Sequence, residues 1–282
     1  MRLVSYVEGD SRRFGTLDDG TVTEIRDAAS VREAADAFDS LPSRLGARSR
    51  VDELRLASPV APLVRNIFCV GWNYLAHFEE GQGLRGSSVA QEIPDRPAFF
   101  TKATGTLIGP YDPVSAHGSV TDKLDWEVEL AVVIGRGGVD IPEASALDHV
   151  LGYSVGNDVT GRNVQREHGG QWFRGKSLDA TCPIGPYIVS PDEAGTLEDL
   201  DIVCRVNGET VQSAKLGDMH FGVARIIAEL SRGLTLVPGD VILTGTPPGV
   251  GFARTPPRYL AVGDIIESEI SGIGLMRNEV VA

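Results

Sequence analysis

The feature that constrains the fold most is the run at residues 124–135, Leu-Asp-Trp-Glu-Val-Glu-Leu-Ala-Val-Val-Ile-Gly. Its apolar and β-branched residues and its closing glycine predict a β-strand that enters a buried core. Side chains alternate between the two faces of a strand, so Glu127 and Glu129 are expected on one face. Two carboxylates beside a core repel each other and lose hydration. The run therefore predicts either a divalent-metal site or a strand end where the glutamates meet water, Arg or Lys.

Composition limits the class of protein. The chain has 282 residues, of which 42% are hydrophobic and 23% are charged, so it can bury a sizeable core. A formal net charge of -13 disfavours nucleic acid and anionic membranes as partners, because both bind basic surfaces. No segment approaches the roughly 20 apolar residues of a membrane helix. Three scattered cysteines are typical of reduced thiols, so we expect a cytoplasmic protein.

Two units are expected along the chain. Residues 1–62 predict a small N-terminal α/β domain, which includes a helix over 30–38 with a capping box at Ser30 and Glu33. Residues 63–282 predict the main domain, with a long polar loop at 81–95 that is typical of a lid. Strands are expected at 2–7, 21–25, 66–71, 98–102, 126–134, 151–155, 202–206, 209–211, 241–244 and 265–270, and helices at 72–80 and 221–232. Strands outnumber helices without regular βαβ alternation, which favours an α+β fold that is mainly β.

Two motifs match known active sites in the wrong context. Residues 170–177 fit the P-loop pattern, but no apolar strand precedes them and bulky Trp172 and Phe173 lie inside the loop. Residues 152–156 fit the nucleophile elbow, but Ser154 is expected in the middle of a strand. Neither motif therefore predicts a nucleotide site or a hydrolase triad.

A third carboxylate follows the strand expected at 151–155. Asp158 is either a helix N-cap or, with Glu127 and Glu129, the third oxygen ligand of a metal. Three carboxylates without clustered His or Cys suit a hard ion, Mg²⁺ first and then Mn²⁺ or Ca²⁺. Arg162 and Gln165 follow at helical offsets and are expected on the same side as Asp158.

Three further segments carry candidate chemistry, and each also has a plain structural interpretation. His77 and Glu80 are three residues apart on an expected helix, which suits a carboxylate-oriented general base but also an incidental surface pair. Lys176 can stabilise an enolate or hold a carboxylate, or it is a solvated loop lysine. Residues 244–251 form a Gly- and Pro-rich turn whose amides and Thr246 hydroxyl can bind an anion, or which only connects two strands.

Taken together and in order, these segments resemble the fumarylacetoacetate hydrolase family from about residue 66 to the C-terminus. The resemblance rests on Val-Gly-Trp-Asn-Tyr-Leu-Ala-His at 70–77, Asp-Trp-Glu-Val-Glu-Leu at 125–130, Gly-Asn-Asp-Val-Thr at 156–160, Gly-Lys-Ser at 175–177, Thr-Gly-Thr-Pro at 244–247 and Ile-Ser-Gly-Ile-Gly at 270–274. Trp126 stands where the family more often has Tyr, and Thr160-Gly161 where it more often has Ser-Ala. The segment 81–95 looks longer than in many members, which bears on substrate size.

The resemblance implies a fold, a metal and a set of roles. It implies a mixed β-sandwich roll, usually a homodimer, with Mg²⁺ or Mn²⁺ on Glu127, Glu129 and Asp158. The family's catalytic lid dyad falls on His77 and Glu80, and its substrate contacts fall on Arg162, Gln165, Lys176 and Thr246.

The activity expected first is metal-dependent hydrolysis of a C–C bond in an acylpyruvate- or fumarylpyruvate-type 2-oxo acid. A small anionic 2-oxo acid would chelate the ion, the ion would stabilise the pyruvate enolate, and His77 would activate water. The alternatives on the same site are isomerisation of 2-hydroxyhepta-2,4-diene-1,7-dioate and decarboxylation of an oxaloacetate-type acid, because enolate stabilisation serves all three. A non-catalytic alternative is a binding protein with a structural cation.

Overall fold

The computed structural model describes residues 1–28, 30–31, 33, 44–83 and 92–282. The strands are β1 Arg2–Glu8, β2 Ser11–Asp18, β3 Thr21–Ile25, β4 Leu45–Arg50, β5 Arg55–Ala57, β6 Ile67–Gly71, β7 Ala98–Lys102, β8 Leu107–Ile108, β9 Val114–Ser115, β10 Leu124–Asp125, β11 Val128–Ile134, β12 Val150–Asn157, β13 Thr160–Gly161, β14 Cys182–Val189, β15 Asp201–Val206, β16 Glu209–Lys215, β17 Val241–Leu243, β18 Ile265–Ile270 and β19 Gly274–Val281. The helices are α3 Leu75–Glu80, α4 Arg162–Glu167, α5 Phe173–Lys176, α6 Pro191–Ala194 and α7 Val223–Leu230, with 3₁₀ turns η2 Val51–Glu53, η3 Thr104–Thr106, η4 Glu143–His149, η5 Leu197–Asp199, η6 Leu216–Asp218 and η7 Gly251–Ala253.

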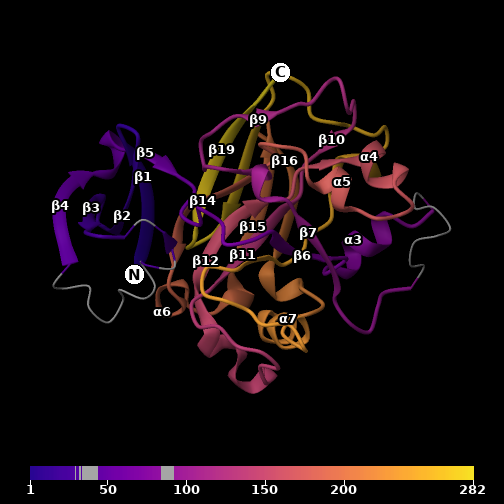
Figure 1. The fold of residues 1–282 in the computed structure, drawn as a ribbon. Coiled ribbons are helices and arrows are strands. Elements are labelled where there is room, and N and C mark those ends of the chain that lie inside the picture. The colour runs from indigo at the N-terminus through magenta and orange to yellow at the C-terminus, as the bar shows by residue number, and fades with distance from the viewer. Residues whose placement is uncertain (29, 32, 34–43, 84–91) are drawn as a thin grey trace.

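Two large sheets form the centre of the molecule (Figure 1). The larger sheet has the order β4-β3-β2-β1-β14-β12-β11-β17-β6-β7, with β5 and β8 joined at its side, and the second has the order β16-β15-β18-β19-β9. Strands β10 and β13 pair separately. The helices α3, α4 and α5 gather at one side of the sandwich, opposite the N-terminal strands (Figure 1). This arrangement confirms the expected α+β, mainly β fold.

Strand β11 separates two apolar clusters. Its residues Val128, Leu130, Val132 and Ile134 pack in the cluster that the second sheet shares. The residues between them, Ala131 and Val133, belong to the cluster on the other face. Because side chains alternate along a strand, Glu129 lies on the same face as Ala131 and Val133. The strand therefore holds a carboxylate among apolar side chains.

Local predictions with strong local signals agree with the structure. The apolar face expected at 221–232 is the buried face of α7, formed by Val223, Ile226, Ile227 and Leu230. The strands expected at 202–206 and 209–211 are β15 and β16, and the two residues between them, Asn207 and Gly208, both have positive φ, as a type I′ hairpin turn requires. The Ser154 hydroxyl donates to the carbonyl of Gly185 within the sheet, which fits a strand residue.

The strand expected at 124–135 is interrupted at two residues. Trp126 and Glu127 lie between β10 and β11 without strand pairing. The side chain of Asn157 accepts a hydrogen bond from the amide of Glu127 at 2.9 Å, and Gln212 accepts one from the amide of Val128 at 3.1 Å. These side chains take the place of backbone partners from a neighbouring strand. Because both come from distant parts of the chain, the run itself could not predict the interruption.

The N-terminal segment extends the large sheet. Strand β1 pairs with β14 through Leu3 opposite Ile188. The expected capping contact is present, because the amide of Glu33 donates to Ser30 Oγ at 3.2 Å. The rest of the helix expected at 30–38, and most of the loop at 81–95, lie outside the described residues. The division into residues 1–62 and 63–282 stays a proposal.

In the part of the chain that the structure describes, no helix is long and apolar enough to cross a membrane.

Candidate active site

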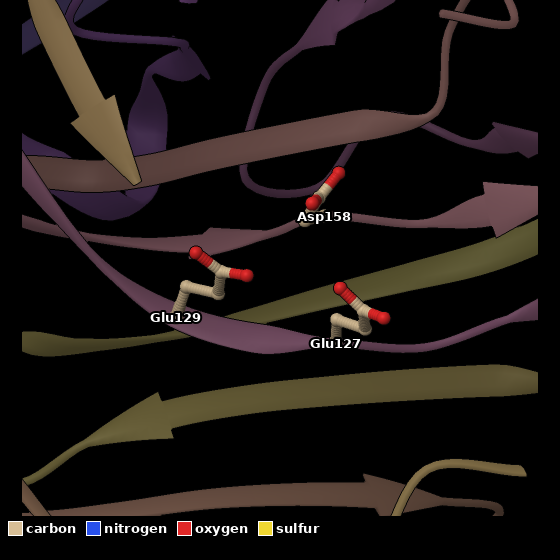
Figure 2. Close-up of side chains that lie close together, drawn as sticks. All are labelled: Glu127, Glu129 and Asp158. Atoms are coloured by element: carbon tan, nitrogen blue, oxygen red, sulfur yellow. The ribbon is translucent and has the colours of Figure 1, made fainter. Parts of the chain in front are cut away.

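Three buried carboxylates meet where β11 and β12 lie side by side. Glu127 directly precedes β11, Glu129 is its second residue, and Asp158 follows the last residue of β12 (Figure 2). Each of the three offers an oxygen within 4.8 Å of the others. The register sets this position, because Glu129 is opposite Gly156 and the amide of Asp158 donates to the carbonyl of Glu127 at 2.8 Å. Helix α4 begins only at Arg162, so the N-cap interpretation of Asp158 is wrong.

Three buried cations surround these carboxylates. The Lys176 ammonium lies 2.6 Å from both Glu127 and Asp158. Lys102, at the end of β7, lies 2.8 Å from the other oxygen of Asp158. The Arg162 guanidinium contacts Glu127 at 2.7 Å and Asp125 at 2.8 Å. Lys176 is therefore no solvated loop residue: it is 2% exposed between two candidate ligands.

The cations are distributed unevenly among the three carboxylates, because they pair with Glu127 and Asp158 and none is within ion-pair distance of Glu129 among the described residues. Burial raises the pKa of Glu127, but the cations Lys176 and Arg162 outweigh it and lower that pKa to about 2. Burial and the neighbouring Asp158 and Glu127 raise the pKa of Glu129 well above its ordinary value. Glu129 accepts a hydrogen bond from the amide of Gly245 at 2.7 Å, which offsets only part of this cost. A positive charge placed beside Glu129 would therefore stabilise its ionised form.

The donor set fits a hard divalent cation. All three candidate ligands are carboxylates, and all are at most 4% exposed. For Glu129, burial and the neighbouring carboxylates make the anionic form unfavourable. Cations of this kind prefer such oxygens to the imidazole and thiolate ligands that softer metals select. The cluster can therefore hold a divalent metal ion.

His77 and Glu80 form a hydrogen-bonded pair on α3. The distance from His77 Nδ1 to Glu80 Oε1 is 2.7 Å, and the other oxygen of Glu80 accepts from the amide of Gly249 at 2.7 Å. A carboxylate at Nδ1 favours the neutral tautomer in which Nδ1 carries the proton, so Nε2 is left with a lone pair. His77 is 8% exposed. The incidental surface pair that the spacing also allowed is therefore excluded by burial.

The turn at 244–251 binds anions, and these anions are carboxylates of the chain itself. The amides of Gly245, Gly249 and Gly251 donate to Glu129, Glu80 and Asp125, each at 2.7 Å. The Thr246 hydroxyl donates to the carbonyl of Val128 at 2.9 Å and accepts from Gln212 at 2.8 Å. One turn thus fixes a candidate metal ligand, the partner of the histidine and the partner of Arg162.

A cavity of about 160 Å³ connects these groups. Of the predicted site residues, His77, Glu127, Glu129, Arg162, Gln165, Lys176 and Thr246 line it directly. Asp158 lies beside it in the carboxylate cluster, and Glu80 lies behind His77. The structure thus brings all nine predicted residues to one place.

Sequence reasoning missed several residues of this site. Trp72 and Trp172 form one wall, with ring centroids 4.7 Å apart, and Phe100 lies 5.1 Å from Trp172. Gly71 permits this wall, since a Cβ there would lie 2.5 Å from the Trp172 ring. Arg166 and Phe252 also line the cavity, and Lys102 lies beneath it. A signal existed only for Lys102, a charged residue that ends an otherwise largely apolar strand.

The chain matches a known protein family and several known enzymes. The family described as "Fumarylacetoacetate (FAA) hydrolase C-terminal" matches residues 66–281. The chain is 44% identical over 230 residues to the oxaloacetate tautomerase YisK of Bacillus subtilis (strain 168), which covers 82% of this chain and 74% of that protein. It is 44% identical over 225 residues to the human mitochondrial oxaloacetate tautomerase FAHD2A, which covers 79% of this chain and 69% of that protein.

Solved structures resemble the whole chain. The fumarylacetoacetate hydrolase of the psychrophile Exiguobacterium antarcticum superposes with a TM-score of 0.87 at 39% identity, over 100% of this chain and 99% of that one. The 2-hydroxyhepta-2,4-diene-1,7-dioate isomerase of Mycobacterium marinum gives a TM-score of 0.78 at 32% identity, over 100% and 98%. The maleylpyruvate hydrolase of Sphingobium sp. SYK-6, solved with manganese(II) and pyruvate, gives 0.77 at 28% identity, over 100% and 99%.

Proposed function

The chain belongs to the fumarylacetoacetate hydrolase family of enzymes, and on that premise we propose that it interconverts the keto and enol forms of a small 2-oxo acid of the oxaloacetate type. The relatives named as oxaloacetate tautomerases and a heptadienedioate isomerase support this alternative better than the C–C hydrolysis expected first. The single observation that carries the proposal is the carboxylate-bound His77, which lines the same cavity as the candidate metal ligands.

The reaction needs little machinery. It breaks one C–H bond at C3 of the substrate and forms one O–H bond at the C2 oxygen, without consuming water. His77 Nε2 accepts the C3 proton, and the Glu80 carboxylate stabilises the imidazolium that results. Lys176 donates a hydrogen bond to the developing enolate oxygen, and Gln165 orients the substrate from α4. His77 then returns the proton to oxygen.

The proposed metal site is Glu127, Glu129 and Asp158, with Mg²⁺ as the first candidate and Mn²⁺ or Ca²⁺ as the others. When bound there, such an ion supplies Lewis-acid polarisation of the keto and carboxylate oxygens. Arg162 forms an ion pair with Glu127. Arg162 therefore has a structural role in addition to its proposed contact with the substrate. Thr246 has protein partners for its hydroxyl and lines the wall of the cavity.

A second candidate is hydrolysis of a C–C bond. The maleylpyruvate hydrolase with bound manganese(II) and pyruvate supports it, because the same dyad can remove a proton from water instead of carbon. Decarboxylation of oxaloacetate is a third outcome of the same enolate chemistry.

A homodimer remains a prediction, and a measurement of the molecular mass in solution tests it.

The test follows substrate and products at once. The protein loaded with Mg²⁺ is given enol-oxaloacetate, and ultraviolet absorbance follows ketonisation while product analysis records pyruvate. We expect ketonisation above the uncatalysed rate, and His77→Gln should lower it by about 10²–10⁴-fold, the usual contribution of a general base. The control is His220→Gln, an exposed histidine outside the cavity. Ketonisation unaffected by His77→Gln would refute His77 as the base. Pyruvate as the main product would replace the proposed reaction with decarboxylation.

A further inference from the structure

Arg166 differs from the other cations of the cavity in its partners. Lys176 and Arg162 are each held by two buried carboxylates. Within residues 1–28, 30–31, 33, 44–83 and 92–282, no carboxylate forms an ion pair with Arg166, although its side chain lines the cavity. Among the described residues, its guanidinium is therefore paired with no anion.

The position of Arg166 is set by α4 and by Phe252. Arg162 and Arg166 are four residues apart, so they lie on one face of α4 about 6 Å apart along its axis. Both guanidinium groups lie over the Phe252 ring, at 4.4 Å for Arg162 and 5.4 Å for Arg166. This cation–π contact orients the Arg166 guanidinium without neutralising its charge.

Depth along the cavity separates the two arginines. Glu129, Glu127 and Arg162 are 1%, 4% and 5% exposed, whereas Arg166 is exposed. With the proposed cation in the carboxylate cluster, a 2-oxo acid would be held there by its 2-oxo-carboxylate end, and its far end would extend toward the exposed Arg166. A guanidinium suits a carboxylate at that end, because its N–H groups match the two oxygens in pairs.

We propose that Arg166 binds the distal carboxylate of the substrate and makes the site select dicarboxylic over monocarboxylic 2-oxo acids. This inference rests on the proposed function for the inner end of the substrate only. Phe252 acts as the positioning residue of this contact. Since Arg166 is exposed, the preference weakens as ionic strength rises.

Binding tests the inference without turnover. Quenching of tryptophan fluorescence serves as the readout, because Trp72 and Trp172 line the cavity. The Mg²⁺-loaded protein is titrated with 2-oxoglutarate and with 2-oxovalerate, which differ only in a terminal carboxylate or methyl group. We expect the wild type to prefer the diacid by about tenfold or more, and Arg166→Gln to bring the two affinities close together. Arg166→Lys should keep part of the preference, as a charge without the paired geometry.

The control is Arg174→Gln, an exposed arginine on the neighbouring helix α5 that does not line the cavity. An unchanged diacid preference in Arg166→Gln overturns the inference. An equal loss of that preference in Arg174→Gln also overturns it, because the preference would then come from the overall positive potential of the surface and not from Arg166. The two proposals fail separately. Absence of oxaloacetate ketonisation by the wild type would refute the proposed function, whereas loss of diacid preference in Arg166→Gln would still support the role of Arg166.

Discussion

Lys102 supplies a positive charge that compensates the buried carboxylate of Asp158 in the absence of substrate. Its ammonium nitrogen lies 2.8 Å from Asp158 Oδ1 and donates to the carbonyl of Val159 at 3.1 Å, and the side chain is fully buried. Lys176 holds the other oxygen of Asp158. Asp158 is thus fixed on both sides, which orients it toward the two glutamates.

Replacing Lys102 by Met keeps the side-chain length and removes the charge. Without metal, we expect the substitution to lower the free energy of unfolding by up to about 3–5 kcal/mol, because it removes one of the two cations that are paired with the buried Asp158. Mg²⁺ should restore more stability to the variant than to the wild type, since an added cation compensates the same carboxylate. Thermal melts with and without Mg²⁺ measure this, with exposed Lys123→Met as the control. An equal loss of stability with and without Mg²⁺ would show that Lys102 contributes through packing alone.

Residue types and spacing named the candidate carboxylates, the His77–Glu80 pair and Lys176, because these residues fall in short motifs. Their roles were chosen over plain structural interpretations only through the resemblance to a family. Arg166, Phe252 and Trp72 could not be named in this way, because their role depends on which distant elements meet. Trp72 has a left-handed backbone, with φ of 57°, and α3 begins at Leu75 and not at residue 72 as expected. No local sequence pattern predicts a left-handed conformation at a tryptophan.

Among the elements, the turn at 244–251 does most to assemble the site. Gly249 has φ of +108°, and a Cβ there would lie 2.0 Å from the carbonyl oxygen of Val211. Its amide also holds Glu80, the partner of His77. The conformation that only glycine tolerates therefore determines the orientation of the proposed base.

Gly249→Ala should be costly for this reason. We expect it to lower the free energy of unfolding by about 1–3 kcal/mol more than a glycine replacement that meets open space, because backbone must move to admit the methyl group. Gly263→Ala is the matched control, with φ of +93° and no atom within 4 Å of the added Cβ. Urea denaturation compares the two variants. Equal losses would show that backbone strain, and not crowding, is the whole cost.

Strand β14 shows why some elements escape sequence analysis. It contains Pro183 and Pro186, which cannot donate to a sheet and so argue against a central strand. In the structure β1 pairs only with residues 188 and 189 at its end, so the proline-containing part has no β1 neighbour there. The strand was not among those expected from the sequence, because its pairing partners change along its length. By contrast, α7 and the 207–208 hairpin were predictable because their signals are local.

At the scale of the whole molecule, the N-terminal segment shares apolar contacts with the main unit. Leu3, Phe14 and Ile25 belong to one buried cluster with Ile184 and Ile188 of β14. The N-terminal ammonium contacts Glu193 at 2.5 Å. We propose that residues 1–62 form a small unit docked on residues 63–282, and that docking, not independent folding, gives it stability.

Docking through a shared cluster predicts a single unfolding transition. Leu3 is 2% exposed, so Leu3→Ala should lower the free energy of unfolding of the entire chain by about 2–5 kcal/mol, as truncation of a buried leucine does. Leu45→Ala, on β4 where the leucine is 38% exposed, should have a small effect. Calorimetry measures both variants. A separate, earlier transition in Leu3→Ala, with the remainder of the melt unchanged, would show that the unit unfolds by itself and that the cluster couples the two parts too weakly to unite them.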